Sequence, residues 1–414
     1  MKFFDLDQWD EILQTITRNK SRSLLTAFGI FWGIFMLVFL MGGSEGLRRL
    51  MASNFAGFAQ NSCFLMTNTT SEAYAGLQSG REWSLELADV DRLRHGVGAI
   101  ETVTPLCAKW GASFKNGNYA MNGTLKGVRA DYAAIEDPHL TYGRFLTDTD
   151  ERDFRKVCVL GKRVCEELFP DVDNPCGRFV SLDGIYYQVV GVTKMSSKIG
   201  VMGSAESSVL VPFTTMQRLY NWGNDVMAIG YTARRGYTVT ELQPQVDHII
   251  KTAHLISPTD TQALFSFNME VMFRMVDNLF RGIEILVWLI GIGTLLSGAI
   301  GVSNIMMVTV RERTSEIGIR RAIGARPSNI LTQIMAESIV LTIIAGLFGI
   351  AFAVLLLQGV ETLTAASGHD ASFQISFGMA VGAAAALTLL GGLAGLAPSF
   401  RALAIKPIDA IRDE

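Results

Sequence analysis

The sequence predicts an integral membrane α-helical protein with four transmembrane helices and a large mixed α/β (α+β) domain inserted between the first and the second helix. Its 414 residues are 49% hydrophobic and 18% charged, with a mean hydropathy of +0.28, which is more apolar than a typical soluble protein. The apolar residues are concentrated in four runs that contain no ionisable side chain. About 240 more polar residues separate the first two runs, which is enough for a separate domain.

Each of the four runs is long enough to cross a bilayer, because a hydrocarbon core of about 30 Å requires about 20 helical residues. The runs are Ser23–Ser44, Ile285–Val310, Ser338–Val360 and Ile375–Phe400. They predict transmembrane helices at 21–45, 283–310, 338–360 and 375–400. A cleaved signal peptide is the alternative for the first run, but its apolar stretch is too long and no A-x-A site follows it.

The positions of Lys and Arg predict the orientation of these helices, because cytoplasmic loops are enriched in both residues. The basic residues beside the runs are Lys2, Arg18, Lys20 and Arg22, then Arg311, Arg313, Arg320, Arg321 and Arg326, and finally Arg401, Lys406 and Arg412. The loop at 361–374 has neither Lys nor Arg. We therefore expect a multi-pass protein of the bacterial inner membrane with both termini (1–20 and 401–414) and the segment 311–337 in the cytoplasm. Residues 46–282 and 361–374 are expected in the periplasm.

The four runs contain no Asp, Glu, Lys, Arg or His. Ion-coupled transporters and pumps generally place such residues inside the membrane, so the sequence argues against these classes. Small residues recur at helical spacing instead, as the pairs Gly29 and Gly33, Gly378 and Gly382, and Gly391 and Gly395. Such pairs allow helices to approach closely, either within one chain or between two copies.

The segment between the second and third runs reads V-R-E-R-T-S-E-I-G-I-R-R-A-I-G-A-R-P-S-N-I, from Val310 to Ile330. Ile317, Ile319 and Ile323 are apolar residues among charged ones, a pattern typical of a short helix that docks into a groove of a partner. A solvated loop that only satisfies the charge rule is the alternative. The stretch E-I-G-I-R-R-A-I-G-A resembles the coupling region of the MacB/FtsX-like permeases of ABC transporters.

The resemblance extends over essentially the whole chain. Trp9 to Ile30 is similar to the N-terminal entry of the same family, and its apolar spacing predicts a cytoplasmic amphipathic helix over 1–20. L-T-Y-G-R-F-L-T-D-T-D, K-V-C-V-L-G-K-R-V-C-E-E-L-F-P and Y-Q-V-V-G-V follow the order found in the periplasmic core domain of the family. One helix, a large domain and three further helices is also the order of elements in this family.

The resemblance implies a permease that works with a separate ATPase. The phosphate-binding motif G-x-x-x-x-G-K followed by Ser or Thr is absent from the sequence, so no cofactor is expected on this chain, and ATP and Mg²⁺ are expected in the partner. The implied assembly contains two ATPase subunits and a second permease, identical or not, in contact with membrane lipids. No nucleic-acid partner and no catalytic residue are expected. The predicted ATPase-docking residues are Arg311, Glu312, Arg313, Glu316, Ile317, Gly318, Arg320, Arg321, Ala322, Gly324 and Ala325.

Local patterns predict several elements of the large domain. Arg178 to Val192 is expected to form a hairpin with Asp183-Gly184 at its turn. Strands are expected at Ser207–Phe213 and Ala228–Ala233, with an inserted β-rich subdomain at about 130–215. A helix is expected over Glu241–Leu255, with Thr240 as its N-cap and Pro244 in its first turn.

At the edges of this domain, the first two membrane helices are expected to continue outward as a stalk. The apolar residues Leu47, Leu50, Met51 and Phe55 are expected to pack on Met272, Met275, Leu279 and Ile283.

All five cysteines lie in the large domain: Cys63, Cys107, Cys158, Cys165 and Cys176. A disulfide between Cys165 and Cys176 is one alternative, and simple burial of free thiols is the other. The five histidines show no ligand-like spacing, so no metal site is predicted.

Two functions remain open from the sequence. The first is a mechanotransmission permease that uses ATP hydrolysis by its partner for efflux, with a periplasmic adaptor and an outer-membrane channel, or for handling lipoproteins or lipid-linked substrates. The second is a regulatory permease that activates a periplasmic cell-wall hydrolase and transports nothing. The size of the inserted domain favours the first.

Overall fold

The computed structural model describes residues 20–53, 55, 57–194, 200–366 and 372–404. The chain forms two compact units, which are described separately here. The membrane unit contains Met1–Leu50 and Asn278–Glu414, and the outer domain contains Met51–Asp277. The amphipathic helix predicted over 1–20 and the end of the tail lie outside the described residues.

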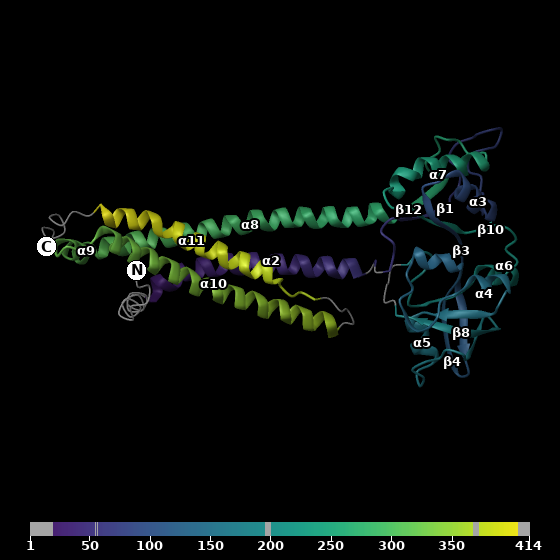
Figure 1. Cartoon of the computed structure of the whole chain (residues 1–414), viewed down its shortest axis with the longest axis horizontal. Coiled ribbons are helices and arrows are strands. Elements are labelled where there is room, and N and C mark those ends of the chain that lie inside the picture. The colour runs from purple at the N-terminus through teal and green to yellow at the C-terminus, as the bar shows by residue number, and fades with distance from the viewer. Residues whose placement is uncertain (1–19, 54, 56, 195–199, 367–371, 405–414) are drawn as a thin grey trace. The chain divides into compact units, whose positions relative to one another are not determined.

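The membrane unit is built from helices (Figure 1). They are α2 (Lys20–Ser53), α8 (Met269–Glu312), α9 (Thr314–Ala322), α10 (Pro327–Ala366) and α11 (Phe377–Leu403). Among the described residues four helices are long and apolar enough to cross a membrane, namely α2, α8, α10 and α11. Each contains one of the four apolar runs, and the inserted domain lies between the first and second of them, so the predicted fold class is confirmed.

Helices α2 and α8 extend beyond their apolar runs, as the stalk prediction requires. Three of the residues predicted to pack in the stalk are exposed: Leu47 at 44%, Met275 at 68% and Leu279 at 53%. The ring of Phe55 contacts Phe273, with 5.5 Å between ring centroids, and Met272 packs against the same cluster. The helical continuations are therefore present, and the packing of the stalk stays a prediction.

Glycines set the closest helix contacts inside the membrane unit. A Cβ atom at Gly298 of α8 would lie 3.2 Å from the carbonyl oxygen of Gly29 in α2. A Cβ atom at Gly349 of α10 would lie 2.8 Å from the carbonyl oxygen of Phe31, so only glycine permits this approach of α10 to α2. The helices enclose a buried apolar core that includes Ile34 and Val302.

Two of the three predicted glycine pairs therefore serve packing within the chain. Gly33 contacts Leu295 of α8, and Gly391 and Gly395 face α10. Gly378 and Gly382 instead face open space and line a groove of about 860 Å³ to which all four long helices contribute.

The outer domain is built on a mixed sheet with the order β12-β1-β11-β3-β4-β9-β6-β8-β5, in which β7 pairs with β3 and β8. A short pair, β2 with β10, stands apart from it. The strands are β1 (Ser62–Thr67), β2 (Leu85–Glu86), β3 (Ile100–Asn116), β4 (Tyr119–Val128), β5 (Leu140–Gly143), β6 (Val157–Leu160), β7 (Phe179–Leu182), β8 (Ile185–Thr193), β9 (Ser208–Pro212), β10 (Asp225–Val226), β11 (Ala228–Ala233) and β12 (Leu264–Asn268). The pairs β4–β9 and β6–β8 are parallel and the other ladders are antiparallel.

The predicted hairpin is present as β7 and β8, with Leu182 opposite Ile185. Its turn residues Asp183 and Gly184 have φ of +49° and +83°, the left-handed values that Asp-Gly turns favour. The two predicted strands are also present, as β9 and β11. The limits of the inserted subdomain, about 130–215, stay a prediction. The strands β3 and β4, which precede this range, belong to the same continuous sheet as the strands inside it.

Short helices cover the sheet: α3 (Leu87–Gly96), the 3₁₀ helix η1 (Ala130–Ala134), α4 (Asp148–Arg152), α5 (Lys162–Leu168), α6 (Phe213–Leu219) and α7 (Val239–Ala253). Helix α7 begins two residues before the predicted start, so the predicted cap Thr240 is wrong. Thr238 is the N-cap, and its hydroxyl accepts a hydrogen bond from the Glu241 amide at 3.2 Å. The Thr240 hydroxyl donates to Glu270 Oε2 instead, and Pro244 lies beyond the first turn.

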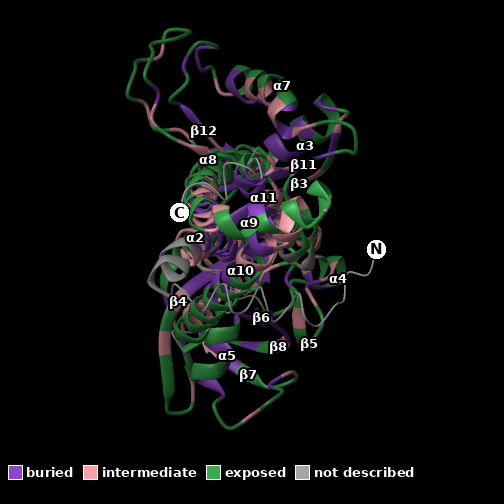
Figure 2. Ribbon diagram, turned by 90° about the vertical axis from the view of Figure 1, so that its left-hand side faces the viewer, coloured by how far each residue is buried: buried purple, intermediate pink, exposed green. Residues whose placement is uncertain are grey.

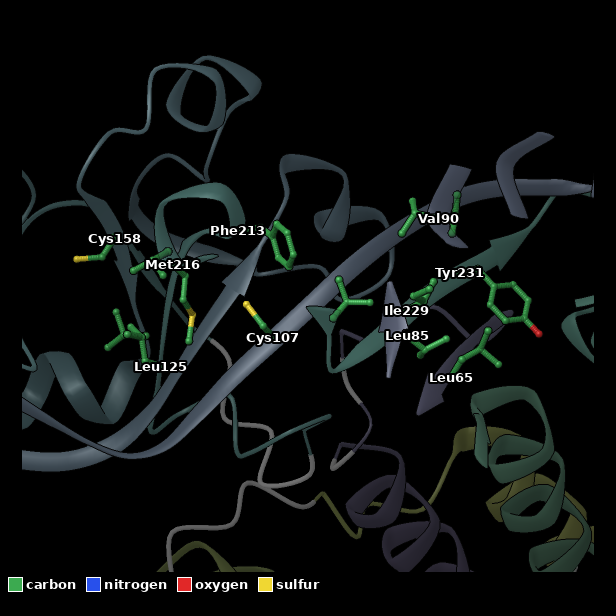
Figure 3. Packing of buried hydrophobic residues seen from close by; sticks show 14 of the residues in the cluster. Leu65, Leu85, Val90, Cys107, Leu125, Cys158, Phe213, Met216, Ile229 and Tyr231 are labelled. Atoms are coloured by element: carbon green, nitrogen blue, oxygen red, sulfur yellow. The ribbon is translucent and has the colours of Figure 1, made fainter. Parts of the chain in front are cut away.

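The core of the outer domain contains four of the five cysteines. Cys107 and Cys158 pack among Leu125, Phe213 and Met216 (Figure 3), and burial raises the pKa of both thiols. All five cysteines are free, so the alternative of a Cys165–Cys176 disulfide is not realised. In the described part of the chain no three His, Cys, Asp or Glu side chains are placed to hold a metal ion.

Candidate coupling site

The segment that links α8 to α10 folds as one short helix between two breaks. Arg313 leaves helical geometry and lies at the N-cap of α9. The helix ends at Ala322 with Ile323 as its C-cap, and Gly324 follows with a φ of +102°, a left-handed value that favours glycine. Helix α10 then starts at Pro327, the position where proline is best tolerated. The Gly and Pro signals of the sequence therefore mark the end of α9 and the start of α10.

The inner face of α9 is apolar. Ile317 is 8% exposed and packs in a cluster with Val310 of α8, Ile330 and Ile334 of α10, and Ala402 of α11. Gly318 beside it is also buried. This cluster holds α9 against the ends of three transmembrane helices.

Arginine side chains of the linker add polar links to the same helices. The Arg313 guanidinium lies 3.4 Å from Glu337 Oε1 of α10, and Glu337 is only 6% exposed. Arg320 lies 2.8 Å from Glu316 Oε1 and 3.2 Å from Gln333 Oε1 of α10. Arg313 and Arg320 are seven residues apart, about two helical turns, so both contacts start from the same side of the segment and tie it to α10.

The outer face of α9 is exposed and partly apolar (Figure 2). Ile323 is 83% exposed and Ile319 is 48% exposed. Ala322 and Gly324 are exposed beside them, as are the charged side chains of Arg311, Glu312 and Glu316. We call Ile319, Ala322, Ile323 and Gly324 the α9 apex.

The predicted docking residues therefore fall into two groups. Arg311, Glu312, Glu316, Ala322 and Gly324 are exposed. Ile317 and Gly318 are buried, and Arg313, Arg320, Arg321 and Ala325 are half-buried. Of the second group, Ile317, Arg313, Arg320 and Arg321 contact other helices of the same chain.

Sequence reasoning missed Ile319 and Ile323 as site residues, although it noted them as apolar. It also missed Gln333 and Glu337, which anchor the linker. A carboxylate directly before the third apolar run was the available signal for Glu337, because such a residue needs a partner when it is buried.

Helix α8 connects this site to the outer domain by an unbroken backbone. Its 44 residues run from Met269, directly after β12, to Glu312, directly before α9. At 1.5 Å per residue this is about 66 Å of continuous helix.

Comparisons with known proteins cover both units. Residues 23–249 match the MacB-like periplasmic core domain, and residues 288–407 match the FtsX-like permease C-terminal domain. The macrolide export ATP-binding/permease protein MacB of Bdellovibrio bacteriovorus is 29% identical over 97% of this chain. The pyoverdine export ATP-binding/permease protein PvdT of Pseudomonas fluorescens is 27% identical over 96% of it.

The chain spans 61% and 58% of the length of these two relatives. A crystal structure of the periplasmic region of MacB from Actinobacillus actinomycetemcomitans is 20% identical, with a TM-score of 0.43, over 54% of this chain and 96% of that region. The first family match alone covers more than half of the chain. The chain therefore belongs to the MacB-like and FtsX-like family of ABC transporter permeases.

Proposed function

We propose that this chain is the permease subunit of a mechanotransmission ABC exporter, and that an ATPase subunit docks on the α9 apex. The observation that carries the proposal is the 83% exposure of Ile323 on a helix whose opposite face is anchored. An isoleucine this exposed at the tip of a charged segment fits the apolar anchor of an interface with a polar rim. ATP and Mg²⁺ bind to the partner subunit.

The proposed orientation places α9 and both termini in the cytoplasm and the outer domain in the periplasm of an inner-membrane protein. The support is the excess of arginine around α9 and the match of residues 23–249 to a periplasmic core domain. In a Cys176→Ser background, which removes the partly exposed native thiol, a cysteine introduced at Ser315 should react with a membrane-impermeant maleimide only after the membrane is opened. Labelling in intact cells would reverse the orientation.

In the proposed cycle, closure of the ATPase pair displaces α9, and α8 carries the displacement to β12 of the outer domain. The outer domain then changes shape around a substrate that it meets outside the membrane. Export of small molecules is the activity that the names of the two relatives state, and we extend it to this chain as efflux. A second permease copy and a periplasmic adaptor complete the assembly.

The decisive experiment removes the apolar anchor. Ile323→Asp should reduce the amount of co-purified ATP-hydrolysing subunit at least ten-fold, since a central apolar contact of an interface contributes about 2 kcal/mol or more. Leu255→Asp is the matched control, because Leu255 is 52% exposed in the outer domain. Unchanged co-purification of the Ile323 variant, or equal loss in the control, would overturn the docking assignment.

A further inference from the structure

The connection between α10 and α11 carries a buried aromatic residue at the outer end of the membrane unit. Phe373 is 8% exposed, and it clusters with Leu357 of α10 and with Leu50, near the outer end of α2. Its ring lies against Gly46 of α2, where an added Cβ atom would overlap the ring. Any residue larger than glycine at this position of α2 would displace the ring.

A second glycine extends this contact by one turn. A Cβ atom at Gly42 would lie 2.5 Å from Leu357 Cδ1 and 3.4 Å from Ile375 Cγ1. Gly43, on another side of the same helix, has no atom within 4 Å of its added Cβ. Gly46 is therefore the seat of the Phe373 ring and Gly42 that of Leu357 and Ile375, while Gly43 shows that this helix has no general need for glycine.

Phe373 is held to α10 as well as to α2. Its main-chain amide donates a hydrogen bond to Glu361 Oε2 of α10 at 3.2 Å. Phe373 is thus held to the outer end of α10 by its main-chain amide, and its ring packs against α2 at Gly46.

In the proposed cycle, this contact connects α2 with the helices that move together with α9. The coupling segment 311–337 is joined covalently to α8 and α10, whereas α2 enters the outer domain at Met51 without a covalent link to that segment. Displacement of α9 can therefore reach α2 only through packing. The contact of Phe373 with Gly46 lies within the last eight residues of α2, which ends at Ser53.

We propose that Phe373 is a positioning residue that transmits displacement of α10 to α2, as a second route to the outer domain beside α8. The inference rests on the proposed function, and it assigns Gly46 as the receiving seat. A buried side chain that is closely packed against a neighbouring helix has few alternative positions, so it transmits a displacement of one helix to the other instead of absorbing it.

The test measures separately whether the complex with the ATPase assembles and whether ATP hydrolysis is still coupled to export. In the complex with its ATPase, Phe373→Ala should retain co-purification and basal ATP hydrolysis while substrate export per ATP hydrolysed falls at least ten-fold. Gly46→Ala should have the same effect and Gly43→Ala should have none. A spin-label distance within the outer domain should change with nucleotide in the wild type and much less in Phe373→Ala.

A cysteine pair separates a mechanical role from a folding defect. Phe373 Cγ would lie 2.6 Å from an added Cβ at Gly46, which places the two Cβ atoms within about 4 Å and inside the range of a disulfide. Gly46→Cys with Phe373→Cys, in a Cys176→Ser background, should lose coupling when reduced and regain most of it when oxidised.

The outcomes distinguish this inference from the proposed function. Full coupling in Phe373→Ala, or no difference between the oxidised and reduced pair, overturns the role of Phe373 while the function stands. Absence of any nucleotide-dependent change in the wild-type outer domain overturns both.

Discussion

The Arg321 guanidinium donates a hydrogen bond to the main-chain carbonyl oxygen of Leu403, 2.9 Å away. Leu403 is the last residue of α11, and its carbonyl lies at the negative end of the helix dipole. The bond therefore links the helix that we assign to docking with the end of the fourth transmembrane helix. An arginine predicted to contact a partner thus has a role inside the chain.

Arg321→Ala should loosen α9 from α11 without removing the α9 apex. A hydrogen bond to a charged group contributes about 1.5–3 kcal/mol when it is protected from water, and less at this half-buried position. We expect faster hydrogen exchange of the α9 amides and a modest loss of ATPase co-purification. Arg326→Ala, an exposed arginine of the same linker, is the control. Equal exchange in wild type and variant would contradict the anchoring role.

Exchanging the charges of Glu316 and Arg320 should be tolerated. The two side chains pair with each other at 2.8 Å across one turn of α9, so Glu316→Lys combined with Arg320→Glu restores an opposite-charge pair. Each single change should weaken co-purification of the ATPase more than the double change does. If the double variant is the weakest, these side chains act directly on the partner and their mutual pairing is secondary.

Gly349→Ala should destabilise the membrane unit. The added methyl group would meet the Phe31 carbonyl oxygen at 2.8 Å and force α10 away from α2, which costs about 1–3 kcal/mol for overpacking. Gly359→Ala on the same helix has open space around its added Cβ atom and is the control. Unfolding of the purified chain in detergent micelles measures both, and equal midpoints would contradict the close approach.

The outer domain should become less stable as the pH rises from about 4.5 to 7. Burial raises the pKa of Glu151 to about 7, and the nearby carboxylates of Asp131 and Asp148 add to this, while Arg129 opposes it. The folded state therefore binds a proton that the unfolded state has released in this range, so folding is favoured at the lower pH. Glu151→Gln should flatten this dependence of the unfolding midpoint, measured on the full chain by tryptophan fluorescence. An unchanged slope in Glu151→Gln would assign the dependence to other groups.

Much of the architecture could be predicted from local patterns. Four runs without charge specify four membrane helices, because an ionisable side chain is costly in hydrocarbon and its absence over 20 residues is a strong signal. The Asp183-Gly184 turn and the strand at Ala228–Ala233 follow from preferences that act within a few residues. The segment that we propose for docking stands out for the same reason, since its charges, glycines and proline lie in one short stretch.

Choices between neighbouring residues depended on the rest of the fold. Thr238 and Thr240 are equally good caps by composition, and Thr238 takes the role because Glu270 binds the Thr240 hydroxyl. The glycine pairs look alike in sequence, yet Gly391 and Gly395 meet α10 while Gly378 and Gly382 face a groove. No local preference distinguishes these cases.

By itself the sequence determined the number of apolar spans, the place of the inserted domain and the position of the charged segment that we propose as the docking site. Only the tertiary structure decided that Ile317 faces inward and Ile323 outward, that Arg321 serves α11, and that Phe373 is seated on Gly46. The physical reason is that hydropathy and turn preferences act through solvent and neighbouring backbone, whereas the direction of a side chain depends on which distant helix supplies its contact surface.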